Sequence, residues 1–505
     1  MEASVAMPEE VESALGDFLL RDTDDEEIAF AVWYPSRGIH RFSILIRHPI
    51  FPLDGDRERH GNVSALPEFV DRAKETARRM RGGLAMIHTH PKARGWQWAS
   101  GPDVYYERDV MAREVFGITG LPLVGLTLSE DRAWSARYYP KEINQAPILE
   151  WCSSVRVVGK MLRMHFNPRL KPEPSVVEEQ IRTTSVWGDR RQADLMRLRV
   201  GIIGAGSVGS GVAEIIARIG AGELYVMDYD VLKPHNLDRS LGASHADAEN
   251  KKSKAILVAE NAKNAATYPG FRSIALDGIS IVEDEGYRSA LDCDVIFSCV
   301  DRPWPRQVLN HLAYSCLIPV VDGGVSFKID PNGKLIHGMF RAQTIGPSRA
   351  CMKCLGVYDE GEIQLDREGK FDDPSYIEHL KPNEQPSRQN IMPFAMGLAG
   401  LETIQFAELV TGLAGKGDLG QQPYDYRAGE LLPIHKSCFD GCEYPHLVGL
   451  GESEMPFLST DLSKERTIAE RTLAGSNASK PTLGRDYTLG VRLTTERIPH
   501  HSGGE

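Results

Sequence analysis

Apolar positions in the middle of the chain follow a strand, helix, strand order. Residues 200–203 form a short apolar run, residues 212–219 carry apolar side chains at helical spacing, and residues 224–227 form a second apolar run. Short apolar runs on either side of a helical repeat predict two buried parallel strands joined by a crossover helix. The pattern therefore predicts a β-α-β unit and an α/β fold for this part of the chain.

The turn after the first strand of this unit has three glycines, Gly204, Gly206 and Gly209, in the pattern G-x-G-x-x-G. Glycine lets the backbone turn tightly and approach a phosphate closely, and the helix N-terminus offers amide donors to an anion. Asp228 closes the second strand, near the spacing of about 20 residues at which a carboxylate meets a ribose hydroxyl. These features predict a nucleotide site, and taken alone they favour NAD.

Polar residues that follow the second strand argue against NAD. In chain order they are Asp228, Asp230, Asn236, Arg239, Lys254 and Asp301. This order resembles the ThiF/MoeB/HesA family over roughly residues 182–445. Members of this family are ATP-dependent adenylyltransferases that activate ubiquitin-like proteins. The resemblance implies a Rossmann-like doubly wound domain with ATP and Mg²⁺ as cofactors.

The resemblance also implies a role for each of these residues. Asn236, Arg239 and Lys254 would steady the ATP triphosphate while a carboxylate attacks the α-phosphate. Asp301, at the end of a strand, would hold Mg²⁺. The two earlier aspartates and the glycine turn would bind the rest of the nucleotide.

Two positions depart from the family pattern. Lys254 lies further from Asn236 than in the family, so Lys252 remains an alternative to it. Arg302 stands where the family has an asparagine after the last aspartate. We favour Lys254 because the apolar residues after it open a helix, as they do in the family.

Residues 182–198 resemble the entry segment of the adenylyltransferase fold. In the family, an arginine from this segment can reach the triphosphate of a partner subunit. We expect Arg182 to have this role in a homodimer, with Arg190 and Arg191 as alternatives.

A second group of polar residues lies within the first 145 residues. A strand-like apolar run ends in His88-Thr-His90-Pro, and Ser100-Gly-Pro-Asp103 follows. Residues i and i+2 of a strand face the same side, so the two histidines project together, and a loop can return Asp103 to them. Two imidazoles and one carboxylate leave one position open on a tetrahedral Zn²⁺, which is typical of a catalytic site.

This H-x-H-P-x₈-S-x₂-D pattern resembles the motif of the JAB/MPN (JAMM) metallopeptidases, which remove ubiquitin-like proteins from conjugates or trim their tails. The resemblance implies a catalytic zinc held by the two histidines and Asp103, with Ser100 steadying the oxyanion. We expect Glu27 to move the proton. Glu26 points to the opposite face of the same strand, so only one of the two can face the zinc.

Four of the eight cysteines form two pairs in the second half of the chain: Cys351, Cys354, Cys438 and Cys442. Four thiolates at such spacing in a reducing compartment most often hold a structural Zn²⁺. Many members of the adenylyltransferase family carry two such pairs, although the second pair here has one more intervening residue.

No cysteine lies between the two pairs, where activating enzymes carry the cysteine that captures the activated tail as a thioester. That segment offers Ser387 instead. Serine is a poor nucleophile without a neighbouring base, so the sequence favours acyl-adenylate formation over transfer to the enzyme.

The composition is that of a globular chain of 505 residues, 42% hydrophobic and 25% charged, with room for two or three domains. A net charge of −12 gives no support for a nucleic-acid or membrane-surface partner. Neither an apolar run of about 18 residues nor a signal-peptide core is present, and eight cysteines are too few for a disulfide scaffold. We therefore expect a cytoplasmic protein.

We divide the chain into a JAB-like peptidase domain (1–145), a linker (146–181), an adenylyltransferase domain (182–450) and a polar tail (451–505). Our interpretation is a bifunctional enzyme of a bacterial ubiquitin-like modification system. It would adenylate the C-terminus of a ubiquitin-like carrier and cleave its tail or conjugates, and a conjugating enzyme would be a further partner. The alternatives are a sulfur-carrier activating enzyme of cofactor or cysteine biosynthesis and a catalytically dead scaffold.

Overall fold

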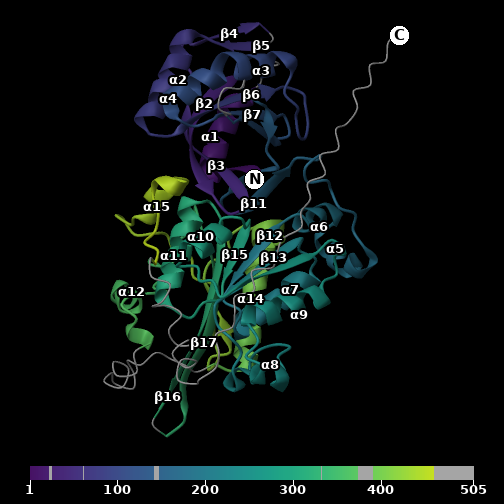
Figure 1. Cartoon of the computed structure of the whole chain (residues 1–505), viewed down its shortest axis with the longest axis vertical. Helices are drawn as coiled ribbons and strands as arrows, with labels where there is room; N and C mark the ends of the chain where they lie inside the picture. The colour runs from purple at the N-terminus through teal and green to yellow at the C-terminus, as the bar shows by residue number, and fades with distance from the viewer. Residues whose placement is uncertain (22–24, 61, 141–146, 331, 373–389, 460–505) are drawn as a thin grey trace, which may run out of the picture.

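Two lobes, each built on its own β-sheet, make up the described part of the chain (Figure 1). The computed structural model describes residues 1–21, 25–60, 62–140, 147–330, 332–372 and 390–459. The N-terminal lobe is at the top of Figure 1 in purple and blue, and the second lobe lies below it in teal, green and yellow. Within these ranges, nine strands form the first sheet and eight form the second.

The strands of the first sheet are β1 (Glu2–Pro8), β2 (Ile28–Arg37), β3 (Arg41–Ile50), β6 (Gly83–His90), β7 (Leu123–Ser129), β8 (Trp134–Tyr139), β9 (Glu150–Trp151), β10 (Ser154–Val158) and β11 (Leu162–Phe166). They lie in the order β11-β10-β1-β3-β2-β6-β7-β8-β9. The other elements of this lobe are α1 (Glu9–Leu19), α2 (Pro67–Arg79), α3 (Gly101–Tyr105), the π-helix η1 (Tyr106–Met111), α4 (Ala112–Thr119) and the hairpin of β4 (Arg57–His60) and β5 (Asn62–Ala65).

Both faces of the first sheet are covered at its centre. Alternate residues of β2 enter two different cores, with Ala29 and Trp33 on one face and Phe30 and Val32 on the other. The strand is therefore buried on both sides and reads as a continuous apolar run rather than an alternating one.

The first sheet extends into the segment 146–181, which the sequence predicts to be a linker. β10 pairs in parallel with β1, with Val5 opposite Val155, and β11 forms the edge of the sheet beside β10. The apolar pattern thins out after Leu162 because β11 is an edge strand whose middle residues are only half-buried. The connection between the sheets is therefore shorter than the sequence predicts.

The strands of the second sheet are β12 (Arg199–Ile203), β13 (Glu223–Asp228), β14 (Arg272–Asp277), β15 (Val295–Ser298), β16 (Val320–Ile329), β17 (Leu335–Ile345), β18 (Gln422–Asp425) and β19 (Glu430–Leu431). Their order is β14-β13-β12-β15-β16-β17-β18-β19. The helices of this half are α5 (Ile181–Trp187), α6 (Asp189–Leu195), α7 (Ser207–Arg218), α8 (His245–Glu249), α9 (Lys254–Ala265), α10 (Asp284–Ala290), α11 (Pro303–Ser315), α12 (Glu360–Arg367), α14 (Met392–Thr411) and α15 (Tyr444–Leu447), with short turns of 3₁₀-helix at η2 (Glu178–Gln180), η3 (Pro234–Asn236), η4 (Lys370–Asp372) and η5 (Gly451–Ser453).

The predicted β-α-β unit is formed by β12, α7 and β13. β12 pairs in parallel with both β13 and β15, so the carboxyl ends of all three strands meet at one edge of the sheet. The chain runs outward from β12 to β14 in one direction and from β15 to β16 in the other. Ligands of open α/β sheets bind at the carboxyl edge where the strand order reverses in this way. The predicted Rossmann-like α/β fold is confirmed.

Buried charged residues join the two lobes. Arg41 of β3 and Arg156 of β10 lie 2.5 and 3.0 Å from the carboxylate of Asp294, which directly precedes β15. The three side chains are at most 2% exposed. Replacing Asp294 would leave two buried guanidinium groups without their carboxylate, so this junction fixes one lobe against the other.

Candidate active sites and metal centres

The glycine-rich turn lies between β12 and α7. Gly204 has a φ of +98°, and a β-carbon there would lie 2.5 Å from the carbonyl oxygen of Cys299, a position open only to glycine. A β-carbon on Gly209 would lie 2.0 Å from the Gly204 carbonyl oxygen, so this glycine permits close packing of helix on strand. No described atom lies within 4 Å of a β-carbon built on Gly206, so the space in front of the turn is open.

Asp228, at the end of β13, holds this turn in place. One of its carboxylate oxygens accepts a hydrogen bond from the amide of Ala205 at 2.7 Å, and the other accepts one from the amide of Asp230 at 2.8 Å. Burial raises the pKa of Asp228, against the opposing effects of Lys254 and the two amides. Asp228 therefore ties the glycine turn to the polar loop after β13. Its predicted contact with a ribose stays a prediction.

Lys254, and not Lys252, faces the carboxylates at this edge of the sheet. Lys254 Nζ lies 2.5 Å from Asp230 Oδ2, and the side chain is 13% exposed. Burial lowers the pKa of Lys254, but the carboxylates of Asp228 and Asp230 raise it above its ordinary value. Lys252 instead contacts Glu260, at 2.7 Å, on an exposed helix face. The geometry favours Lys254 as the predicted phosphate-binding lysine.

Asn236 and Arg239 occupy the turn between β13 and α8. Asn236 Oδ1 accepts a hydrogen bond from the amide of Lys233 at 2.9 Å. Arg239 Nη1 donates to the carbonyl oxygen of His235 and to the Asp238 carboxylate, both at 2.7 Å. Both side chains are engaged within their own turn, so Arg239 would have to leave these partners to bind a triphosphate.

Asp301 lies exposed on the loop between β15 and α11. Its charge contributes to the raised pKa of Lys254 after burial and nearer carboxylates, so the two side chains share the carboxyl edge of the sheet. Arg302, which departs from the family pattern, lies 3.1 Å from the Asp366 carboxylate. Asp366 also accepts a hydrogen bond from the amide of Trp304 at 3.1 Å. Arg302 and Asp366 therefore fix the start of α11 directly after Asp301.

Asp322 is a buried carboxylate at the same edge that the sequence analysis did not single out. It accepts hydrogen bonds from Ser298 Oγ at 2.8 Å and Gln343 Nε2 at 2.6 Å. Guanidinium nitrogens of Arg306 and Arg341 lie 3.3 and 3.5 Å from it, and these two side chains are about one-sixth exposed. Two such cations can bind an anion at the sheet edge. An acidic residue directly after an apolar run was the signal that could have identified the group.

Arg182 and Ser387 are not placed at the nucleotide site by the structure. Arg182 is exposed in the first turn of α5. The preceding Gln180 side chain contacts Gly220, just beyond the C-terminal end of α7, whereas the glycine turn lies at its N-terminal end. The predicted contact of Arg182 with the triphosphate of a partner subunit stays a prediction. Ser387 lies outside the described residues.

His88, His90 and Asp103 come together in the first lobe, at the end of β6. The Nε2 atoms of the two histidines are 3.2 Å apart, and one Asp103 oxygen lies 3.6 and 3.7 Å from them. Donor atoms around a tetrahedral zinc, with bonds of ~2.0–2.1 Å, are separated by about 3.3 Å. Burial would raise the pKa of Asp103, but the two histidines hold it well below its ordinary value. The donor set and its spacing fit a zinc ion with one coordination position left.

The glutamate predicted to move the proton faces away from these histidines. Ile28 of β2 pairs with His88, so Glu27 is opposite Thr89, with which it exchanges two hydrogen bonds. Side chains opposite one another in a sheet point to the same face, and Thr89 lies on the face away from both histidines. Both oxygens of the Glu27 carboxylate accept hydrogen bonds from Arg57, at 2.8 Å each. This placement does not fit the role predicted for Glu27.

Glu26 is the glutamate on the histidine face. The pairing of β2 with β6 ends at Ile28, and continued by two residues it would place Glu26 opposite His90. A hydrogen bond that His90 donates to the Asp103 carboxylate is the main cause of the raised pKa of His90, and the charge of Glu26 adds to it. Glu26 is half-buried. The continuation of this pairing favours Glu26 over the Glu27 predicted from the sequence.

Ser100 caps the helix that carries Asp103. Ser100 Oγ accepts a hydrogen bond from the amide of Asp103 at 3.2 Å, and the Asp103 carboxylate accepts one from the amide of Ser100 at 2.8 Å. This reciprocal capping box fixes the start of α3 and so the direction of Asp103. A side-chain hydrogen bond from Ser100 also lowers the pKa of Asp103, so the hydroxyl would have to leave this carboxylate to make the predicted oxyanion contact.

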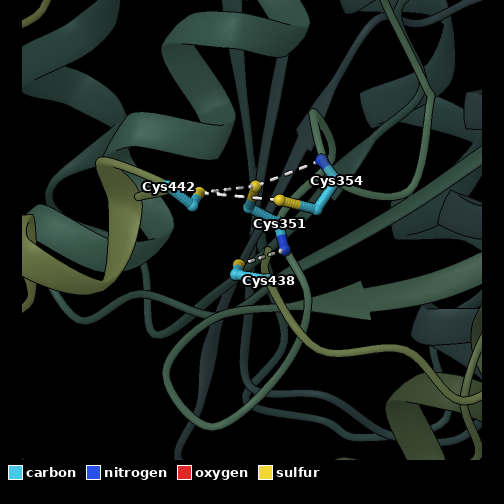
Figure 2. Close-up of side chains that lie close together, drawn as sticks. All are labelled: Cys351, Cys354, Cys438 and Cys442. Atoms are coloured by element: carbon cyan, nitrogen blue, oxygen red, sulfur yellow. Dashed lines mark hydrogen bonds between the residues drawn. The ribbon is translucent and has the colours of Figure 1, made fainter. Parts of the chain in front are cut away.

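The four paired cysteines converge in the second lobe (Figure 2). Cys442 Sγ lies 3.7 Å from Cys351 Sγ and 3.6 Å from Cys354 Sγ. Sulfur atoms around a tetrahedral zinc with bonds of ~2.3 Å are separated by about 3.8 Å. The sulfur atoms of Cys351 and Cys438 also accept hydrogen bonds from backbone amides, at 3.4 and 3.3 Å. The cluster fits a closed structural zinc site, and all eight cysteines are free of disulfides.

Comparisons with known proteins bear on the second lobe. Residues 177–423 match the model of the ThiF family. These residues form a ThiF-family domain. The match covers slightly less than half of the chain, and it contains the glycine turn, Lys254, Asp301 and the first cysteine pair.

Individual relatives resemble the same part of the chain. The "Adenylyltransferase and sulfurtransferase MOCS3" of Caenorhabditis briggsae is 25% identical over 169 residues, which are 34% of this chain and 39% of that protein. The molybdopterin-synthase adenylyltransferase of Escherichia coli is 26% identical over 166 residues, 32% of this chain and 61% of that protein. The chain thus spans less than two thirds of the length of either relative.

The crystal structure of E. coli MccB with ATP is similar at a TM-score of 0.40 and 16% identity, over 53% of this chain and 74% of that one.

Among the described residues, no helix combines the length and the apolar character that a membrane span requires.

Proposed function

We propose that the second lobe adenylates the C-terminus of a ubiquitin-like or sulfur-carrier protein. The observation that carries the proposal is the placement of Lys254 among carboxylates at the carboxyl edge of the sheet, beside the open glycine turn. The ThiF-family match and the relatives named as adenylyltransferases support it. The terminal carboxylate of the carrier would attack the α-phosphorus of ATP, forming an acyl–adenylate bond and releasing pyrophosphate.

The residues of the site divide this work. The amides at the start of α7 and the open side of Gly206 would receive phosphate oxygens. Lys254 and Arg239 would neutralise the charge of the triphosphate. Asp301 has the exposed carboxylate, at a strand end, that Mg²⁺ coordination requires, and the ion would supply further positive charge at the phosphates.

Transfer of the activated carrier to an enzyme thiol is less well supported. Of the four cysteines outside the cluster, Cys152, Cys293 and Cys316 are buried and Cys299 is half-buried. Burial raises the pKa of each of these thiols, which makes them poor nucleophiles. Because these thiols are poor nucleophiles, direct transfer of the carrier from its adenylate to an acceptor fits the structure better than transfer through an enzyme thioester. An adduct that resists thiol reductant and disappears in Ser387→Ala would show transfer to the predicted serine.

We further propose that the first lobe is a zinc peptidase that trims or releases the same kind of carrier. The spacing of His88, His90 and Asp103 supports this proposal. A zinc ion held there would supply a Lewis acid for a scissile carbonyl. Glu26 would accept a proton from the attacking water and pass it to the leaving amine, and the Ser100 hydroxyl would donate to the oxyanion.

A sulfur carrier of a biosynthetic pathway is the second candidate substrate, favoured because one relative is named a sulfurtransferase and the other is named for molybdopterin synthase. A carrier of a conjugation system is favoured by the proposed peptidase, since trimming and deconjugation both act on such tails.

Carrier-dependent ATP–pyrophosphate exchange tests the proposal for the second lobe. We expect exchange with one class of carrier ending in Gly-Gly, and its loss in Asp301→Ala. If neither a carrier of a conjugation system nor a sulfur carrier supports exchange, the proposal that the second lobe adenylates a carrier is wrong. Cleavage of a carrier extended beyond its Gly-Gly, with His88→Ala as the control, tests the first lobe separately.

A further inference from the structure

A fully buried polar network connects the helical segment after Asp103 to the sheet of the first lobe. The Glu107 carboxylate accepts hydrogen bonds from Arg137 Nε at 2.7 Å and Arg137 Nη2 at 2.5 Å. It also accepts one from the Tyr139 hydroxyl at 2.7 Å. Arg137 Nη1 donates to Thr127 Oγ1 at 2.9 Å. Glu107, Arg137 and Thr127 have no exposed surface, and Tyr139 is 1% exposed.

The network links the two elements that supply the zinc-ligand candidates. Glu107 lies in η1, which continues directly from α3, the helix that carries Asp103. Thr127 of β7 is the parallel partner of His88 in β6. Arg137 of β8 bonds to both Glu107 and Thr127, so it joins the aspartate-bearing helix to the strand beside the histidines.

Two local features of the chain accommodate this network. Gly125 lies opposite Arg137 in the pairing of β7 with β8. A β-carbon at Gly125 would lie 2.6 and 2.7 Å from the two carboxylate oxygens of Glu107, so a larger residue would displace the ion pair. Glu107 enters the interior within a π-helix, a local widening that often accompanies functional sites.

A buried ion pair adds little stability compared with apolar residues of the same volume. The ion pair instead fixes the position of the helical segment on the sheet, because a bidentate pair sets both the distance and the angle between its two partners. Asp103 lies at the start of a helical segment formed by α3, η1 and α4 without a break, so its position depends on where that segment is anchored to the sheet. Glu107 follows within one turn and provides that anchor.

We propose that the Glu107–Arg137 pair is a positioning element that holds Asp103 against His88 and His90, and so sets the zinc affinity of the first lobe. The inference rests on the zinc site proposed above. Neither Glu107 nor Arg137 contacts the ion in this account. They act through the position of Asp103, as outer-shell residues of metal sites do.

The test is the zinc affinity of the full chain, measured by competition with a chelator. Glu107→Gln keeps the shape of the side chain and removes its charge. We expect it to weaken zinc binding at the histidine site by about 10- to 100-fold, while the zinc of the cysteine cluster is retained. Glu114→Gln is the matched control, because Glu114 is an exposed carboxylate further along the same helical segment, paired with Lys74. It should leave the affinity unchanged.

Tyr139→Phe provides a milder variant if Glu107→Gln fails to fold. It removes one hydrogen bond to Glu107 and leaves the ion pair in place, and we expect a severalfold loss of zinc affinity at a similar melting temperature. Unchanged affinity in the folded variants would overturn the positioning role, and so would an equal loss in Glu114→Gln. The zinc content of the wild-type chain and of His88→Ala tests the site itself. If the two contain the same amount of zinc, the proposed zinc site is wrong, and this inference is wrong with it.

Discussion

Lys254 Nζ lies 2.5 Å from Asp230 Oδ2, whereas Lys252, on the same segment, contacts Glu260 at the surface. Of the two lysines, Lys254 is the one that faces the carboxylates beside the glycine turn. We predict that Lys254→Ala lowers carrier-dependent pyrophosphate exchange by about 100-fold or more, the usual cost of removing a group that neutralises transition-state charge. Lys252→Ala should retain exchange close to that of the wild type. Equal losses in the two variants would contradict the placement of Lys254.

A second prediction separates the two glutamates of the first lobe. Glu26→Gln should abolish tail cleavage without a change in melting temperature, because general-base catalysis contributes about 10²- to 10⁴-fold. Glu27→Gln should instead lower the melting temperature, since it breaks the bidentate pair with Arg57, and should keep cleavage. Cleavage rates and thermal melts of both variants decide the matter. Loss of cleavage only in Glu27→Gln would restore the role first predicted for it.

The histidines and glutamates of the first lobe show what the sequence can and cannot predict. The two histidines, i and i+2 on one strand, were predictable because the alternation of a strand is a local property. The choice between Glu26 and Glu27 depends on how β2 is aligned with β6, and a shift of one residue exchanges the two faces. No pattern within either strand specifies that alignment.

The second lobe shows the same division. The glycine turn and the aspartate after β13 belong to one β-α-β unit, and their spacing predicts their proximity. Asp322 is surrounded by side chains from β15, α11 and β17, which only the folded sheet brings together. The predicted start of the linker at residue 146 is too early, because the fully buried strand β10 and the half-buried edge strand β11 both follow it.

The junction between the lobes should weaken in acid. Burial would raise the pKa of Asp294, but Arg41 and Arg156 lower it well below its ordinary value of 3.8. A folded-state pKa below the unfolded one means that the contribution to stability is complete above the unfolded pKa and declines as the pH falls below 3.8.

We therefore predict that the melting temperature falls steeply as the pH is lowered from 4 by about one to two units. Asp294→Asn leaves two buried guanidinium groups without their carboxylate, so it should cost about 3–5 kcal/mol at pH 7 and remove part of the acid dependence. Thermal melts across this range provide the measurement. An Asp294→Asn chain with the stability of the wild type at pH 7 would contradict the account of the junction.

Metal analysis distinguishes the two proposed zinc sites. Cys351→Ser should lose the zinc of the closed cluster and melt at a lower temperature, because such sites stabilise the fold directly. It should keep the zinc held by the histidines and keep tail cleavage. His88→Ala should show the reverse. The loss of the same metal equivalent in both variants would mean that one of the sites is misassigned.

The most direct test of an enzyme with two sites for one carrier is pyrophosphate exchange, measured with a mature carrier ending in Gly-Gly and with the same carrier extended beyond it. The wild-type chain should support exchange with both, because the first lobe removes the extension that hides the carboxylate. His88→Ala should support exchange with the mature carrier only. Exchange with the extended carrier in His88→Ala, or no exchange with the mature carrier in the wild-type chain, would contradict the account.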